Sequence, residues 1–382
     1  MKYRKFGKLD WDASVLGFGV MRLPVRGKNV RDIMVEPSIN MIRHAIDNGV
    51  NYIDTAYVYH GGKSEELLGK ALKDGYREKV RIATKMPMRL VEKEEDLDDF
   101  FYTHLQRLET DFIDFYLLHG LRESRWKKVK DFKVLEWAEE KLDKGEIRYL
   151  GFSFHDDLAL FKEIVDYYDW TFCQIQLNYM DTEYQAGLEG LRYAADKGLA
   201  VVVMEPIKGG KLAVTPPDEV AKIWGKSPVE RTPAEWALQW VWNLPEVNVV
   251  LSGMSEMWHV KENLTYADRS GPGTLSESDM KLYDEVREAY NRLGFVGCTA
   301  CQYCMPCPAG LDIPTILGYY NEYYMSGGDP GVKERYWEEI SPEKHSEYCI
   351  ACGECEEKCP QELPIRKLMN ENNRLFPKPD NI

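Results

Sequence analysis

Eight short apolar, β-branched segments, each followed by helical periodicity, limit what this chain can fold into. The segments predict strands over residues 15–20, 51–56, 80–85, 112–119, 148–154, 172–178, 200–206 and 248–253. Amphipathic stretches between them predict helices over 64–75, 95–109, 133–145, 158–168 and 232–243. Such alternation requires parallel strands joined by crossover helices, and eight units in about 250 residues favour a closed (β/α)₈ TIM barrel. No GxGxxG motif follows the first strand, which argues against a Rossmann fold.

Composition and charge exclude several functional classes. The formal net charge of −14 opposes binding to a phosphate backbone, which needs clustered Lys and Arg. No segment has the roughly 18 apolar residues of a membrane span, and the first residues lack the apolar core of a signal peptide. We therefore expect a cytoplasmic protein that binds neither nucleic acid nor a membrane.

Eight of the nine cysteines form two runs beyond residue 297. The first run contains Cys298, Cys301, Cys304 and Cys307, and the second contains Cys349, Cys352, Cys355 and Cys359. The second run follows the bacterial ferredoxin pattern C-x₂-C-x₂-C-x₃-C-P, in which three thiolates hold one cluster and the fourth reaches the other. The first run is one residue shorter before its last cysteine, and it also ends in Cys-Pro. The ninth cysteine, Cys173, is expected to be a small buried hydrophobe.

The two runs predict two 4Fe-4S clusters with crossed ligation. Cys298, Cys301 and Cys304 would share a cluster with Cys359, and Cys349, Cys352 and Cys355 would share one with Cys307. A pair of Cys₄ zinc sites is the alternative, although zinc ribbons pair two distant C-x₂-C steps rather than three consecutive ones.

The cysteine runs also set the domain organisation. A Gly-, Pro- and Ser-rich segment at 268–276 ends the strand–helix pattern. We expect a barrel domain over 1–285 and a small α-helical ferredoxin-like domain over 286–382, with a helical insertion at 311–345. Residues 1–14 are expected to form a hairpin that covers the barrel floor.

Polar residues at the ends of barrel strands are the candidates for catalysis, because barrel enzymes carry their chemistry there. Asp54, Lys85 and His119 end the second, third and fourth predicted strands, and Tyr59 follows the second. A phenol can protonate the alkoxide that forms when a carbonyl accepts a hydride. A lysine beside the phenol would lower the pKa of the phenol, and an aspartate would keep that lysine charged.

These segments resemble the aldo-keto reductase superfamily. The resemblance rests on DTAYVYHGGKSEELLGKAL, IATKMP, DFYLLHG and LSGMSEMWHVKENL, and covers about two-thirds of the chain. It implies that the family's catalytic Asp, Tyr, Lys and His fall on Asp54, Tyr59, Lys85 and His119.

The resemblance also implies a nicotinamide coenzyme, NAD(P)(H). The residues implied are Ser153 and Gln174 for the carboxamide, Ser252 and Gly253 for the pyrophosphate, and Glu262 and Asn263 for the adenine.

Three positions depart from the family pattern. Phe154 replaces the Asn after Ser153, Met204 replaces the aromatic residue that stacks on nicotinamide, and His259 replaces the arginine that binds the 2′-phosphate, with Lys261 nearby. NAD and NADP therefore both remain open, as does a bound flavin.

The sequence as a whole predicts an oxidoreductase that reduces a small carbonyl compound, or oxidises an alcohol, by hydride transfer. Its two clusters would pass electrons to or from an external carrier such as ferredoxin. One alternative is a conventional NAD(P)H-dependent reductase whose clusters are purely structural. Another is a non-catalytic dinucleotide-binding redox sensor, against which the complete tetrad argues.

Overall fold

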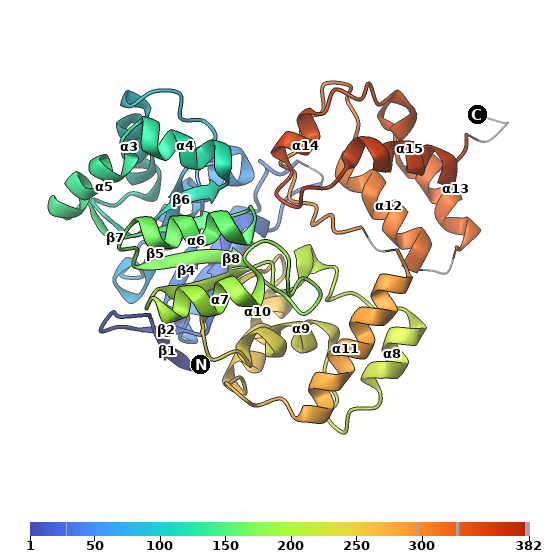
Figure 1. Ribbon diagram of the computed structural model, residues 1–382, viewed down its shortest axis with the longest axis horizontal. Helices are drawn as coiled ribbons and strands as arrows, with labels where there is room; N and C mark the ends of the chain where they lie inside the picture. Colours follow the sequence, from blue (N-terminus) through green and yellow to red (C-terminus); the bar gives the residue numbers. More distant parts are fainter. Residues whose placement is uncertain (28, 295, 326–327, 379–382) are drawn as a thin grey trace. The chain divides into compact units, whose positions relative to one another are not determined.

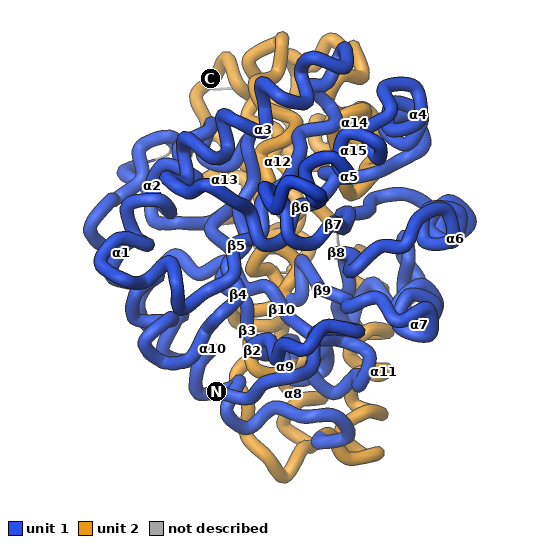
Figure 2. Tube along the Cα trace, turned by 90° about the vertical axis from the view of Figure 1, so that its left-hand side faces the viewer, with its two compact units in different colours: residues 1–206, 237–274 blue, residues 207–236, 275–382 orange. Residues whose placement is uncertain are grey.

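The computed structural model describes residues 1–27, 29–294, 296–325 and 328–378. The chain forms two compact units (Figure 2). The first unit contains residues 1–206 and 237–274, and the second contains residues 207–236 and 275–382.

The first unit is a closed barrel of parallel strands in the order β10-β3-β4-β5-β6-β7-β8-β9 (Figure 1). The strands are β3 (Leu16–Gly19), β4 (Tyr52–Asp54), β5 (Arg81–Met86), β6 (Ile113–Leu121), β7 (Ile147–Phe154), β8 (Phe172–Gln176), β9 (Ala200–Met204) and β10 (Val247–Gly253). Each predicted strand matches one of these, and the predicted barrel is confirmed. Cys173 is fully buried in β8.

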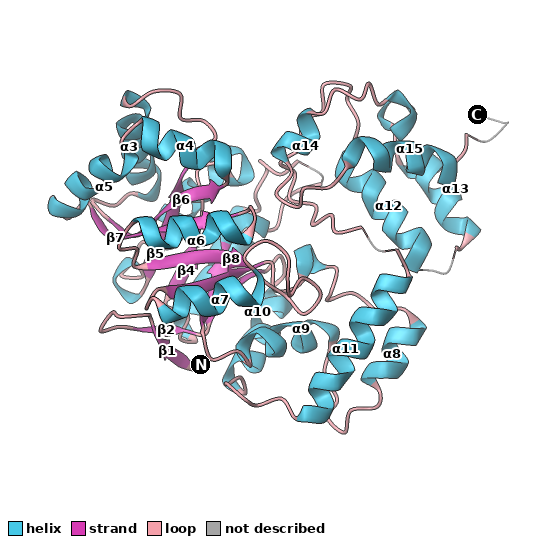
Figure 3. Cartoon of the chain, in the orientation of Figure 1, coloured by secondary structure: helices cyan, strands magenta, loops and turns pink. Residues whose placement is uncertain are grey.

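Helices alternate with the strands and cover the outside of the barrel (Figure 3). They are α1 (Val35–Asp47), α2 (Lys63–Ala71), α3 (Glu95–Leu108), α4 (Glu123–Asp131), α5 (Val134–Asp143), α6 (Leu158–Tyr167), α7 (Gly187–Asp196), α9 (Pro233–Trp242) and α10 (Met257–Asp268). Each helix turns one apolar face inward: in α1, Met41, Ile42 and Ala45 are buried, while Asn40 is exposed.

An N-terminal hairpin closes one end of the barrel. Its strands, β1 (Tyr3–Lys5) and β2 (Asp12–Ser14), pair antiparallel. Phe6, between them, is fully buried, and its ring centroid lies 4.7 Å from that of Phe115 and 5.8 Å from that of Phe172. These aromatic rings fill the end at which the strands begin, so the chemistry is left to the opposite end.

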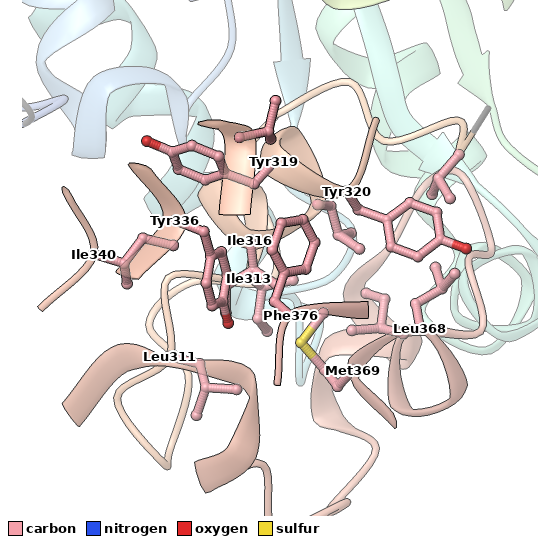
Figure 4. Close-up of a cluster of buried hydrophobic side chains, with 14 of the residues drawn as sticks. Leu311, Ile313, Ile316, Tyr319, Tyr320, Tyr336, Ile340, Leu368, Met369 and Phe376 are labelled. Atoms are coloured by element: carbon pink, nitrogen blue, oxygen red, sulfur yellow. The ribbon is translucent and has the colours of Figure 1, made fainter. Parts of the chain in front are cut away.

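The second unit is helical. Its helices are α8 (Asp218–Trp224), α11 (Glu277–Arg292), α12 (Ile313–Met325), α13 (Pro330–Glu339), α14 (Glu354–Lys358) and α15 (Ile365–Leu375). The core of its C-terminal part contains Leu311, Ile316, Tyr336, Met369 and Phe376 (Figure 4). The rings of Tyr336 and Phe376 stack at 4.6 Å. In the part of the chain that the structure describes, no helix is long and apolar enough to span a membrane.

Residues 207–236 group with this helical unit, although their position in sequence is that of a barrel crossover. The indoles of Trp224 and Trp236 stack at 4.3 Å, and Tyr283 of α11 packs edge-on against both. Helix α11 runs through the predicted boundary between residues 285 and 286, which stays a prediction.

Candidate active site and cluster-binding loops

Lys85 joins the candidate catalytic residues of two neighbouring strands. Its ammonium Nζ donates to Asp54 Oδ1 at 2.6 Å, to the Thr55 carbonyl at 2.8 Å and to the Tyr59 hydroxyl at 3.5 Å. Lys85 is only 1% exposed and Asp54 only 3%. The parallel pairing of β4 with β5 brings these strand ends together, so one buried cation touches both a carboxylate and a phenol.

Gln174 binds the carboxylate oxygen of Asp54 that Lys85 does not contact. Burial raises the pKa of Asp54 and lowers the pKa of Lys85, and the attraction between the two groups opposes both shifts. Gln174 Nε2 donates to Asp54 Oδ2 at 3.1 Å, so both carboxylate oxygens are hydrogen-bonded. The carboxylate is thereby held in one orientation.

His119 lies on β6, half-buried, with its ring centroid 6.2 Å from that of Tyr59 in an edge-on arrangement. Burial and the positive charges of Lys85 and Arg125 lower the pKa of His119 well below its usual value. At neutral pH the imidazole is therefore uncharged. A neutral imidazole can donate an N–H to a carbonyl oxygen without placing a second full charge beside the lysine.

The sequence contains no indication of the buried carboxylate of Glu65, which acts electrostatically on Lys85. Glu65 of α2 is fully buried and accepts hydrogen bonds from Thr84 Oγ1 at 2.6 Å, His104 Nδ1 at 2.6 Å and Arg107 Nη1 at 3.3 Å. Burial raises the pKa of Glu65, but these partners outweigh it, and the pKa lies below its usual value. Its charge also favours the protonated form of Lys85. A glutamate in the first turn of an amphipathic helix gives no sequence signal of this role, since most such residues face water.

Ser153 of β7 and Gln174 of β8 lie side by side, and both are buried. Ser153 Oγ accepts the backbone N–H of Gly120 at 2.7 Å. Within the described ranges, the buried Gln174 Oε1 has no hydrogen-bond partner. An unsatisfied buried acceptor costs about 1–3 kcal/mol, which a ligand N–H would recover. The carboxamide NH₂ of nicotinamide is such a donor, so these residues fit that coenzyme.

The residues expected at the far end of the coenzyme gather where β10 meets α10. Asn263 Nδ2 donates to Ser252 Oγ at 2.8 Å, and Gly253 follows directly at the end of the strand. Glu262 is half-buried on the same helix. Helix α10 begins at Met257, and the backbone N–H groups of a helix start favour an anion such as pyrophosphate.

His259 caps this helix. Its Nδ1 accepts the backbone N–H groups of Ser255 at 3.3 Å and Glu256 at 3.2 Å, so Nδ1 is unprotonated. Burial lowers the pKa of His259, although Glu256 and Glu262 act in the opposite direction. The ring is thus uncharged at neutral pH and does not replace the fixed charge of an arginine.

The two cysteine runs share backbone conformation at three equivalent pairs of positions. Three equivalent pairs have positive φ: Ala300 (51°) and Ala351 (53°), Gln302 (67°) and Gly353 (87°), and Gly310 (79°) and Glu362 (49°). Side chains other than glycine adopt this region at a cost of about 1–2 kcal/mol each, so surrounding structure must enforce it. These shared positions match the similar cysteine spacing of the two runs, although in the described residues of the two runs only the second contains a helix, α14.

The thiols gather in two groups, and each group draws on both runs. Cys307, Cys349, Cys352 and Cys355 line one open cavity. The neighbouring Cys301, Cys298 and Cys359, together with burial, raise the pKa of Cys304. Over the described residues, no three His, Cys, Asp or Glu side chains could share one metal ion. Four thiols that surround a cavity instead fit a cluster with several iron atoms.

Two family models cover most of the chain. Residues 15–288 match the model described as "Aldo/keto reductase family", and residues 297–365 match the model described as "4Fe-4S dicluster domain". The chain is thus an oxidoreductase barrel followed by an iron–sulfur module. It belongs to the aldo/keto reductase family.

Named relatives agree with this assignment. An "Uncharacterized oxidoreductase YqkF" of Bacillus subtilis is 27% identical over 74% of this chain and 95% of its own. The "NADH-specific methylglyoxal reductase" of Escherichia coli is 25% identical over 76% of this chain and all of its own. The solved structure of the holo form of aldo-keto reductase AKR11C1 from Bacillus halodurans superimposes with a TM-score of 0.61, at 28% identity over 75% of this chain and 96% of its own.

Proposed function

We propose that this protein reduces a small carbonyl compound at Asp54, Tyr59, Lys85 and His119, and exchanges electrons with a carrier through two 4Fe-4S clusters. A bound nicotinamide would supply the hydride, the clusters would pass single electrons, and a flavin would be needed to convert between the two-electron and one-electron steps. The observation that carries the proposal is the contact of one buried ammonium with both Asp54 Oδ1 and the Tyr59 hydroxyl.

Each member of the tetrad has a separate task. Tyr59 donates its phenolic proton to the developing alkoxide, and the ammonium of Lys85 stabilises the phenolate that remains. Asp54 keeps Lys85 charged and in place despite its burial. The uncharged His119 donates a hydrogen bond to the carbonyl oxygen and orients it toward the phenol.

The Oε1 of Gln174, unpaired among the described residues, supports a nicotinamide coenzyme, because it suits a carboxamide NH₂. Ser153 would hold the other side of that carboxamide, and Ser252, Gly253, Glu262 and Asn263 the remainder of the dinucleotide. With His259 engaged as a helix cap, we expect NAD(H) to bind about as well as NADP(H). The name of the Escherichia coli relative is in keeping with NADH use.

The eight cysteines would hold the clusters in the crossed arrangement described above. The physiological partner would be a one-electron carrier such as ferredoxin, and reduced thiols of this kind suit the cytoplasm. Clusters that only stabilise the second unit are the second candidate, because metal binding can supply folding energy in addition to that of the unit's own hydrophobic core.

Two measurements on anaerobically purified protein test the proposal. Tyr59→Phe should abolish reduction of a probe aldehyde such as methylglyoxal while coenzyme affinity stays within about twofold, because the substitution removes a proton donor and little contact area. Activity within about threefold of the wild type would contradict the tetrad. Reduction of the clusters by NAD(P)H, or by an alcohol substrate with NAD(P)⁺, separates redox-active from structural clusters.

A further inference from the structure

The loop after β9 lies directly against the first cysteine run. A Cβ atom built at Gly209 would lie 2.4 Å from the carbonyl oxygen of Thr299 and 2.8 Å from its Cα. Only glycine, here at a φ of +67°, allows this approach between backbones. Thr299 directly follows Cys298, so the loop borders the backbone that carries the first thiols.

This loop brings two lysines to the run. Lys208 is 6% exposed, and its Nζ lies 3.6 Å from a Cβ built at Gly297, the residue before Cys298. Lys211, half-buried, interacts electrostatically with both Cys298 and Lys208. A buried ammonium is costly without nearby negative charge, and a group of thiolates provides such charge.

The second run has the opposite surroundings. Glu356 directly follows Cys355 in the chain. Two cations at this run are ion-paired with its glutamates: Arg366 with Glu356 at 2.7 Å and Lys358 with Glu354 at 3.1 Å. Glu354, on the same short helix, is exposed. The barrel-derived loop therefore places positive charge at one group of thiols and not at the other.

We propose that Lys208 and Lys211 selectively raise the reduction potential of the cluster held by Cys298, Cys301, Cys304 and Cys359. The proposal rests on the proposed function only in requiring that the cysteines hold 4Fe-4S clusters. Four thiolates make such a cluster negative, and reduction adds one electron with no bond or proton change. Positive charge next to it stabilises the reduced form more than the oxidised form. Burial strengthens this effect, whereas at the second run water screens the exposed Glu354, and Arg366 neutralises Glu356.

A redox titration of the iron-loaded, full-length protein tests the proposal. Electron paramagnetic resonance follows each cluster, and Cys301→Ser and Cys352→Ser assign the two signals. Lys208→Gln and Lys211→Gln should each lower the midpoint potential of the first-run cluster. The double variant should lower its reduced-to-oxidised ratio at a fixed potential at least about tenfold, which is about 59 mV for a one-electron couple. The second-run cluster should not shift.

Two controls keep the test specific. Lys208→Arg retains the charge and should preserve the potential, and Lys222→Gln removes an exposed lysine of α8 and should change neither cluster. If Lys208→Gln loses iron, Lys211→Gln carries the test. Equal shifts in both clusters, or no shift at full iron content, would overturn the inference and leave the proposed function standing. Wild-type protein without cubane iron would overturn both.

Discussion

Replacing Lys85 by Met should destabilise the barrel mainly through the aspartate that remains. The ammonium and Asp54 Oδ1 are 2.6 Å apart, an attraction of about 6 kcal/mol at an effective dielectric constant of 20. Desolvation of both groups offsets part of this gain. Removing one partner of a buried pair typically costs about 3–5 kcal/mol, because the other charge stays buried and uncompensated. We expect the thermal midpoint of the barrel to fall by at least about 6 °C.

The stability lost in Lys85→Met should be larger at higher pH. Burial already raises the pKa of Asp54, and loss of Lys85 raises that pKa further. A carboxyl whose folded pKa exceeds its unfolded pKa binds more protons when folded, so it loses stability as pH rises through the folded pKa. Lys85→Met should therefore lower the free energy of unfolding less at about pH 5 than at pH 7. The difference should be about 1.4 kcal/mol for each unit by which the pKa of Asp54 changes.

A double-mutant cycle measured by urea unfolding completes the test. Asp54→Asn should lower the free energy of unfolding less in the Lys85→Met background than in the wild type. The two changes should differ by a coupling energy of about 0.5–3 kcal/mol. Lys70→Met, on the exposed face of α2, is the matched control and should change stability by less than about 0.5 kcal/mol. A loss of unfolding free energy in Lys85→Met that stays constant with pH, or that grows toward acid pH, would refute the reasoning.

Three further results follow from the site. In equilibrium titrations, NAD(H) and NADP(H) should bind with similar affinity, because His259 is an uncharged helix cap; a hundredfold preference for NADP(H), on the order of 3 kcal/mol, would show that Lys261 or another cation binds the 2′-phosphate. Cys307→Ala should damage the cluster of the second run and spare that of the first, as counted by iron content and spectroscopy; selective loss of the first-run cluster would contradict crossed ligation. Gln174→Leu should weaken coenzyme binding and also lower turnover, because it removes a carboxamide partner and one hydrogen bond to Asp54; unchanged affinity would place the nicotinamide elsewhere.

The barrel could be predicted because its information is local. Each strand is a short apolar run, and each crossover helix has its own periodicity, so the order of elements follows from the order of patterns. The grouping of residues 207–236 could not be predicted in this way. It depends on the packing of Trp224 and Trp236 against Tyr283, and no local pattern records which aromatic side chains meet.

The same distinction holds at the site. Asp54 and Lys85 could be selected because polar residues at the ends of buried strands are exceptional. The hydrogen bond from Gln174 to Asp54 spans 120 residues of sequence and becomes visible only when the barrel is closed. His259 aligns with a phosphate-binding position, yet its Nδ1 is occupied by backbone N–H groups, which depends on how α10 begins.

The division of the thiols between the two runs has a consequence for synthesis. A ribosome delivers Cys298, Cys301 and Cys304 well before Cys359, and α12 and α13 emerge in between. The group of Cys307, Cys349, Cys352 and Cys355 is complete only when Cys355 has left the exit tunnel, and the other group only when Cys359 has, by which time the whole barrel sequence is free to fold. Iron delivery to both groups would therefore act on a chain whose barrel is already formed. A nascent chain stalled before Cys359 would carry seven cysteines beyond the barrel, of which Cys298, Cys301 and Cys304 would lack their fourth partner.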